Sequence, residues 1–298
     1  MSSYLEASAR ERVAHLLDAG TFEEFLPPSC RVVSPHLAQL DVPVSFDDGA
    51  IVGRGTLQGK RIFVAAQEGG FMGGAVGEVH GAKLVGMLRR AIAEQAHAVL
   101  LLLETGGVRL HEANAGLIAV SEVMRAVLDT RAAGVPVVVL VGGSNGCFGG
   151  MGIVARCANA IVMSEEGRLA MSGPEVIETA SGVEEFDSRD RALVWRTTGG
   201  KHRYLLGDCQ AIVADDIAKF ARAASAAIAT CRAAGIELSL DDLQAEHRML
   251  TQRLQSFGAM DDPREIWQAL GVPEPVGVPL LEADAFMNMA ASHRAELR

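Results

Sequence analysis

The sequence predicts an α/β fold with a largely parallel sheet, and three observations support this. Fully apolar segments of strand length alternate with helical segments along the middle of the chain, each of the first two is followed by a glycine-rich turn, and two segments rich in β-branched residues precede them. A parallel connection needs a crossover of roughly a dozen or more residues, so this alternation favours parallel pairing. We expect one domain with a leading helix over residues 1–234, and a C-terminal helical extension and tail over residues 235–298.

The N-terminal third is expected to contain one helix and one hairpin. Residues 4–19 carry apolar side chains near helical spacing, and Gly20 follows as a stop signal. After a turn-rich stretch, residues 49–59 and 60–68 are rich in β-branched residues and meet near Gly59, which predicts a hairpin that enters the sheet.

The central segment alternates between apolar runs of strand length and runs with helical spacing. The predicted elements are a strand over residues 98–104, a helix over residues 113–132, a strand over residues 135–141, a short helix over residues 151–157 and a strand over residues 159–164. In open α/β sheets, ligands bind at the carboxyl ends of the strands, which is where the glycine-rich turns lie.

The C-terminal third is expected to be helical. Residues 217–234 and 240–255 are two helical runs that would cover a sheet or a partner, and the proline-rich segment from Gly271 predicts an extended arm. We find neither an internal repeat nor a low-complexity linker, which favours a single domain with helical extensions.

Composition excludes several function classes. The chain has 298 residues, of which 49% are hydrophobic, and a formal net charge of -10, with no basic stripe for nucleic acid. The five cysteines form no C-x-x-C pair, so we expect a reducing cytoplasm and no metal site. The amphipathic N-terminus lacks the apolar region of a signal peptide, and no apolar run is long enough to span a membrane.

Glycine placement is the strongest local signal for chemistry. Glycines cluster in three loops, at positions 69, 70, 73, 74 and 77, at positions 106 and 107, and between positions 142 and 152. Glycine lets backbone N–H groups approach a ligand, and amides at the start of a helix favour an anion or a developing oxyanion. A single pair would only permit a tight turn, but three loops together favour an amide-lined hole. The G-x-x-x-x-G-K-[ST] and G-x-G-x-x-G phosphate motifs are missing.

Two nucleophiles in the third glycine segment give alternative hypotheses. Residues 142–146 fit G-x-S-x-G directly after a strand, so Ser144 could belong to a serine hydrolase with His247 and either Asp208 or Asp215. Cys147 is better interpreted as a small packed thiol, because nothing in the sequence locates a base for it.

Two further groups are candidates for substrate contact. His111 and Glu112 follow the second glycine segment directly, although a solvated or packed role is the more common one for such residues. Lys201, His202 and Arg203 could neutralise a carboxylate or phosphate, and a solvated basic turn explains them equally well.

Four segments together resemble a known family. Residues 67–84, 104–117, 134–152 and 171–178 occur in the order typical of the acyl-CoA carboxyltransferase beta family. Within that family the chain is most similar to the biotin-independent malonate decarboxylase beta-subunit branch, through residues 197–208 and the lack of a zinc ribbon. The resemblance extends over about residues 9–234.

The resemblance implies a fold and a site. The fold would be crotonase-like, built of stacked ββα units with additional N- and C-terminal helices. The thioester oxyanion hole would be formed by backbone amides of Gly106, Gly107, Gly149, Gly150 and Met151. The residues expected to contact substrate are Phe71, Met72, Gly73, Gly74, His111, Phe148, Lys201, His202 and Arg203.

The resemblance also implies partners. A homologous gamma subunit would complete the active site in a heterodimer or larger hetero-oligomer, and a malonyl/acetyl transferase subunit would load the carrier. The substrate would be malonyl held as a thioester on the CoA-like prosthetic arm of an acyl carrier protein, with no cofactor bound directly and no biotin. The products would be the acetyl thioester and carbon dioxide. The alternatives are a biotin-dependent carboxyltransferase subunit, the Ser144 hydrolase and a non-catalytic scaffold.

Overall fold

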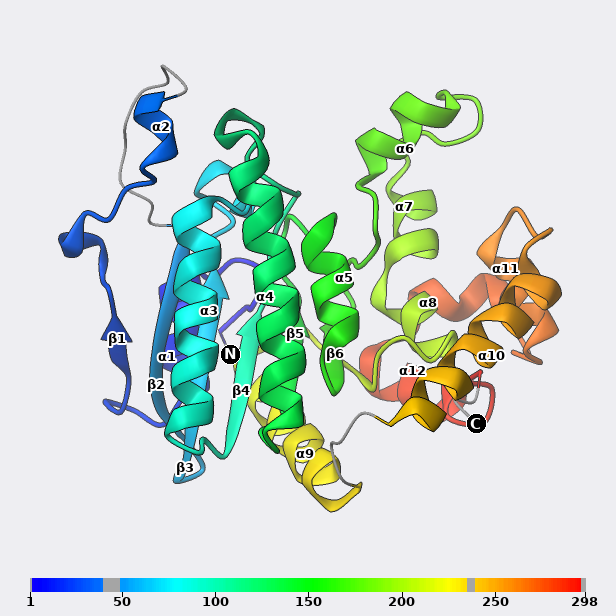
Figure 1. Ribbon diagram of the computed structural model, residues 1–298. Helices are drawn as coiled ribbons and strands as arrows, with labels where there is room; N and C mark the ends of the chain where they lie inside the picture. The colour runs from blue at the N-terminus through cyan, green and yellow to red at the C-terminus, as the bar shows by residue number, and fades with distance from the viewer. Residues whose placement is uncertain (1, 40–48, 235–238, 296–298) are drawn as a thin grey trace.

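The structure, a computed structural model, describes residues 2–39, 49–234 and 239–295 and contains a seven-stranded sheet between two layers of helices (Figure 1). The strands follow one another across the sheet in chain order. They are β1 (Glu23–Phe25), β2 (Ala50–Leu57), β3 (Lys60–Gln67), β4 (Ala98–Leu102), β5 (Val137–Val141), β6 (Ala160–Ser164) and β7 (Ala211–Val213).

The pairing confirms the predicted hairpin and the predicted parallel sheet. β2 pairs antiparallel with β3 and with β1, whereas β3 through β7 are parallel to one another. The hairpin closes through Gln58 and Gly59, which both have positive φ. Two-residue turns of this kind match the twist of the strands they connect.

The two helical layers cover opposite faces of the sheet. One face carries α3 (Glu78–Ala93), α4 (Asn114–Ala132) and α5 (Gly150–Cys157), and the other carries α1 (Ala9–Leu16) and α9 (Ile217–Ala234). Alternate side chains of each central strand enter the two hydrophobic clusters, so that Leu101 faces one layer and Leu100 the other. Because both faces are covered, these strands are continuously apolar.

The remaining helices lie mainly beside the β7 edge of the sheet (Figure 1). They are α6 (Pro174–Ser181), α7 (Arg191–Thr198), α8 (Gly200–Leu205), α10 (Leu240–Phe257), α11 (Pro263–Ala269) and α12 (Ala283–Ala290), while the short α2 (His36–Gln39) lies near the opposite edge. Trp267 and Phe286 belong to the hydrophobic cluster that lies between the sheet and α3, α4 and α5.

The extended arm predicted from Gly271 is wrong. The segment forms a 3-10 helix, η4 (Pro275–Leu280), and then α12. The buried side chains of Val278 and Phe286 draw it onto the core, and this packing outweighs the three prolines. The leading helix is also shorter than predicted, because Ser8 and Glu11 form a capping box that starts α1 at Ala9.

No helix in the described part of the chain is both long and apolar enough to cross a membrane.

Candidate active site

Three loops at the carboxyl ends of β3, β4 and β5 meet at one place. We call them the first loop (residues 68–77), the second loop (residues 104–109) and the third loop (residues 142–149). The Gly106 N–H donates to the Gly73 carbonyl at 2.9 Å, which joins the second loop to the first. The Phe148 N–H donates to the Thr105 carbonyl at 3.0 Å, which joins the third loop to the second.

Glycine is required where these loops approach most closely. A methyl group on Gly74 would lie 1.9 Å from the Glu104 carbonyl oxygen, and Gly74 has a φ of +69°. A methyl group on Gly149 would lie 3.3 Å from the Gly107 Cα, and Gly149 has a φ of +65°. Any side chain at these positions would strain the backbone and push the loops apart.

The five amides expected to form the oxyanion hole differ in their availability. The N–H groups of Gly106 and Gly149 donate to the carbonyls of Gly73 and Met171, each at 2.9 Å. The Gly107 N–H donates to the Thr105 hydroxyl at 3.0 Å. Among the described residues, no hydrogen-bond acceptor faces the N–H groups of Gly150 and Met151, which begin α5. The geometry therefore leaves the amides of Gly150 and Met151 free for a ligand, whereas the Gly107 amide would have to exchange the Thr105 hydroxyl for it.

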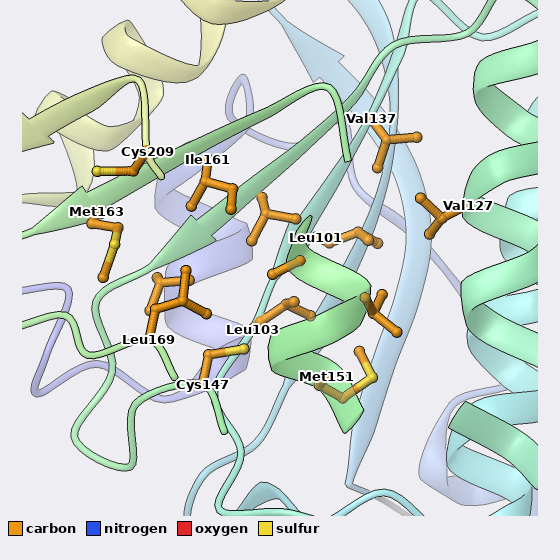
Figure 2. Close-up of a cluster of buried hydrophobic side chains, with 14 of the residues drawn as sticks. Leu101, Leu103, Val127, Val137, Cys147, Met151, Ile161, Met163, Leu169 and Cys209 are labelled. Carbon is orange, nitrogen blue, oxygen red and sulfur yellow. The ribbon is translucent and has the colours of Figure 1, made fainter. Parts of the chain in front are cut away.

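The side chains of the third loop and of α5 anchor these amides in the core. Cys147 and Met151 point into the hydrophobic cluster with Leu103 and Leu169 (Figure 2). Burial raises the pKa of the Cys147 thiol to about 12, so it is protonated at neutral pH. Cys147 is therefore a packed thiol, as the sequence indicated.

Aromatic side chains lie beside the loops, each next to an arginine. The Arg109 guanidinium lies 5.3 Å from the centroid of the half-buried Phe71 ring, and that of Arg168 lies 5.7 Å from the buried Phe148 ring. Met72 in the first loop is 48% exposed. Neither arginine belongs to a motif that predicts a role for it, although Arg109 lies only two residues after Gly107.

His111 lies on the exposed side of the second loop. It belongs to the short helix η3 (Leu110–Glu112), and its Nε2 is 3.9 Å from the buried Glu112 carboxylate. The Glu112 carboxylate accepts hydrogen bonds from the Glu78 N–H at 2.6 Å and from Arg109 at 3.3 Å. Glu112 thus ties the second loop to the start of α3, which is a packing role.

Lys201, His202 and Arg203 on α8 are engaged by other parts of the protein. Lys201 donates to the carbonyls of Pro279 and Leu281, His202 accepts a hydrogen bond from the Trp267 indole at 3.1 Å, and Arg203 contacts Asp208 at 3.3 Å. The contacts of Lys201 and His202 tie α8 to the C-terminal segment. Binding of a substrate anion by the three residues stays a prediction from the sequence.

We expect His202 to make stability depend on pH. Burial, with help from Arg203, lowers its pKa from 6.5 to about 3, so the folded state keeps the ring neutral. Between these values the unfolded chain binds the extra proton, and stability is lost as the pH falls below about 6.5. Between about pH 7 and about pH 5, the free energy of unfolding measured with denaturant should fall in the natural chain. The fall should be about 2 kcal/mol larger than in His202→Gln. Equal differences in the two proteins would contradict a neutral, buried His202.

The hydrolase alternative is not supported by the contacts of its residues. The Ser144 hydroxyl donates to the Glu104 carboxylate at 3.1 Å. Asp208 interacts with Arg156, Arg203 and Arg253. Asp215 accepts a hydrogen bond from the Leu5 N–H at 2.8 Å, and His247 is exposed on α10. Within the described residues, no histidine contacts Ser144.

We therefore expect Ser144→Ala to retain turnover within about threefold, because only one neutral donor to Glu104 is lost. Turnover of the malonyl thioester that the sequence resemblance implies as substrate measures this, and fluorophosphonate labelling of the natural chain is the complementary assay. A labelled Ser144 together with an inactive variant would restore the hydrolase.

The described residues contain no group of three or more histidine, cysteine, aspartate or glutamate side chains that could hold a metal ion.

Comparison with known proteins connects this geometry to a family. A model described as the carboxyl transferase domain matches residues 6–222. The chain is 42% identical to the malonyl-S-ACP:biotin-protein carboxyltransferase MADC of Malonomonas rubra, over 98% of this chain and 97% of the relative. It is 40% identical to a chain of a Pseudomonas malonate decarboxylase hetero-tetramer in complex with malonate, with a TM-score of 0.78 over 88% of this chain and 95% of the other.

A second solved structure, the Pseudomonas malonate decarboxylase MdcD-MdcE hetero-dimer, is 37% identical, with a TM-score of 0.66 over 84% of this chain and 96% of the other. These likenesses confirm the crotonase-like α/β fold that the sequence motifs implied.

Proposed function

This chain belongs to the carboxyl transferase family, and on that premise we propose that it is the beta subunit of a biotin-independent malonate decarboxylase. Its reaction would convert a malonyl thioester on an acyl carrier protein to the acetyl thioester and carbon dioxide, in the cytoplasm. The observation that carries the proposal is the close approach of the second and third loops, since a methyl group on Gly149, the residue before the Gly150 and Met151 amides, would lie 3.3 Å from the Gly107 Cα.

Decarboxylation of a malonyl thioester requires a stabilised enolate. When the bond between the malonyl methylene and its carboxylate breaks, carbon dioxide leaves and the electron pair moves toward the thioester oxygen. Donors at that oxygen stabilise this transition state more than the ground state. The Gly150 and Met151 amides also lie at the positive end of α5, which adds to the effect. The enolate carbon then takes up a proton to give the acetyl thioester.

A poorly hydrated surrounding assists the loss of the carboxylate. The half-buried Phe71 and the exposed Met72 bring apolar surface to the first loop, whereas Phe148 is only 3% exposed and is packed within the protein. A carboxylate held against the first loop has fewer water contacts than in bulk, which favours its conversion to neutral carbon dioxide.

Exposed apolar residues around the loops support a partner subunit. Leu110 is 90% exposed and Met171 is 70% exposed, and Met72 lies in the first loop. A homologous gamma subunit covering this edge would remove these side chains from water and complete the site. The two Pseudomonas structures are a hetero-dimer and a hetero-tetramer, which supports hetero-oligomeric assembly. An acyl carrier protein with a CoA-like arm would then deliver the malonyl group, loaded by a malonyl/acetyl transferase subunit.

A second candidate is a carboxyltransferase that passes the carboxyl group to a biotin protein. The name of the Malonomonas rubra relative, which is similar over nearly the whole chain, specifically favours it. Both candidates form the same thioester enolate, so the amides would serve either one. They differ in whether the carboxyl group is released as carbon dioxide or transferred to biotin.

The decisive experiment measures carbon dioxide release from malonyl-carrier thioester by this chain, by the gamma subunit and by both together, without biotin and with avidin present. Release only by the mixture supports the proposal. Activity of this chain alone would contradict the shared site. Release that requires a biotin protein and is blocked by avidin would establish the second candidate.

A further inference from the structure

A buried carboxylate lies where the three loops meet. Glu104 lies two residues after the end of β4, opens the second loop and is only 3% exposed. A methyl group on Gly143 of the third loop would lie 2.2 Å from the Glu104 carboxyl group, and one on Gly69 of the first loop would lie 2.4 Å from it. The glycines of both neighbouring loops therefore leave space for this one side chain.

The carboxylate collects donors from separate parts of the chain. Its Oε1 accepts hydrogen bonds from the Asn145 N–H and the Ser144 hydroxyl, each at 3.1 Å. Its Oε2 pairs with the buried Arg12 of α1. An ionised carboxylate only accepts hydrogen bonds, so it can hold several donors at once, and charge-assisted bonds are stronger than neutral ones.

A backbone link and a side-chain link extend this network to the first loop and the strand before it. The Glu104 N–H donates to the Gln67 side chain at 3.1 Å, and the Asn145 amide group donates to the Gly69 carbonyl at 2.9 Å. Glu104 is three residues before Gly107, and Asn145 is five residues before Gly150. The contact between Glu104 and Asn145 thus joins the segment that carries the Gly107 amide to the segment that leads to the Gly150 and Met151 amides.

We propose that Glu104, paired with Arg12, is a positioning residue that sets the separation between the Gly107 amide and the Gly150 and Met151 amides. The inference rests on the proposed function, in which those amides bind the same thioester oxygen. Glu104 itself does not touch the thioester. It acts through the third loop, whose displacement by about 1 Å would be enough to cost about 10²-fold in rate.

The test compares Glu104→Gln and Glu104→Ala in the complete complex. The carboxamide keeps the shape and one acceptor, so turnover should fall about tenfold, whereas alanine should lose about 10²-fold. The KM for malonyl-carrier thioester should change less than about twofold in Glu104→Gln, because the amides that Glu104 positions stabilise the transition state more than the bound substrate. A merely structural role would lower the amount of folded complex and leave kcat per folded complex unchanged.

The matched control is Glu94→Gln. Glu94 also accepts hydrogen bonds from two arginines, Arg54 and Arg90, each at 2.7 Å, but it lies at the C-terminal end of α3, the opposite end of that helix from the first loop. Its turnover should match that of the natural complex. A loss as large as in Glu104→Gln would show that removing any arginine-paired carboxylate slows the complex, and would overturn the inference.

Hydrogen–deuterium exchange separates this inference from the proposed function. In Glu104→Gln the amides of residues 143–152 should exchange faster, while those in α3 keep their protection. Unchanged exchange in residues 143–152, or a kcat equal to that of the natural complex, would overturn the positioning role. If the natural complex releases no carbon dioxide, the proposed function fails by itself, and the exchange result still decides whether Glu104 holds the third loop.

Discussion

Replacing Gly149 by alanine should lower carbon dioxide release by about 10²- to 10³-fold, the loss expected when an oxyanion hole is disrupted. The added methyl group would lie 3.3 Å from the Gly107 Cα, between the two loops that carry the candidate donors. The φ of +65° at Gly149 also disfavours any residue with a side chain. Both effects move the Gly150 and Met151 amides away from that of Gly107. Turnover of the assembled complex is the measurement, with assembly checked by size-exclusion chromatography.

The control is Gly134→Ala, which carries similar backbone strain without the contact. Gly134 follows the end of α4 with a φ of +80°, and a methyl group there meets no atom of the described residues within 4 Å. We expect a small loss of stability and unchanged turnover. Equal turnover losses in the two variants would mean that strain alone slows the enzyme, and the amide arrangement would then lose its support.

Replacing Arg12 by methionine should lower the free energy of unfolding by about 3–5 kcal/mol, which is typical when one partner of a buried ion pair is removed. Arg12 is 3% exposed and is the cation paired with Glu104. It also donates to the backbone carbonyls of Tyr4 and Leu5, at 2.7 and 3.2 Å. Without it, the Glu104 carboxylate stays buried without its counter-charge. Urea unfolding of the isolated chain measures the loss.

Arg10→Met on the same helix provides the comparison. The Arg10 side chain is 46% exposed and pairs with Glu24 at 2.7 Å, so its loss should cost at most about 1 kcal/mol. If Arg12→Met costs no more than Arg10→Met, then the Arg12–Glu104 pair contributes little to the fold. The position of the Glu104 side chain would then depend on its hydrogen bonds with Ser144 and Asn145 alone.

The order of strands and helices could be predicted largely from local pattern. The apolar runs that became β4 and β5 and the helix α4 lie within a few residues of their expected positions. This worked because a strand covered on both faces is continuously apolar, and its pattern needs no knowledge of its partner. α3 was not predicted, because its first residues follow a glycine-rich segment and themselves include Gly81.

The amino-acid sequence by itself determined the parallel core, the three glycine-rich loops at its carboxyl edge and the family resemblance, because each depends on residues close together in the chain. The tertiary structure decided which amides are available, since the partners of Gly106 and Gly149 lie 33 and 22 residues away. It likewise decided that Arg12 meets Glu104 across 92 residues and that His202 meets Trp267 across 65. Such pairings are selected by packing and desolvation in the folded core, and no local pattern encodes them.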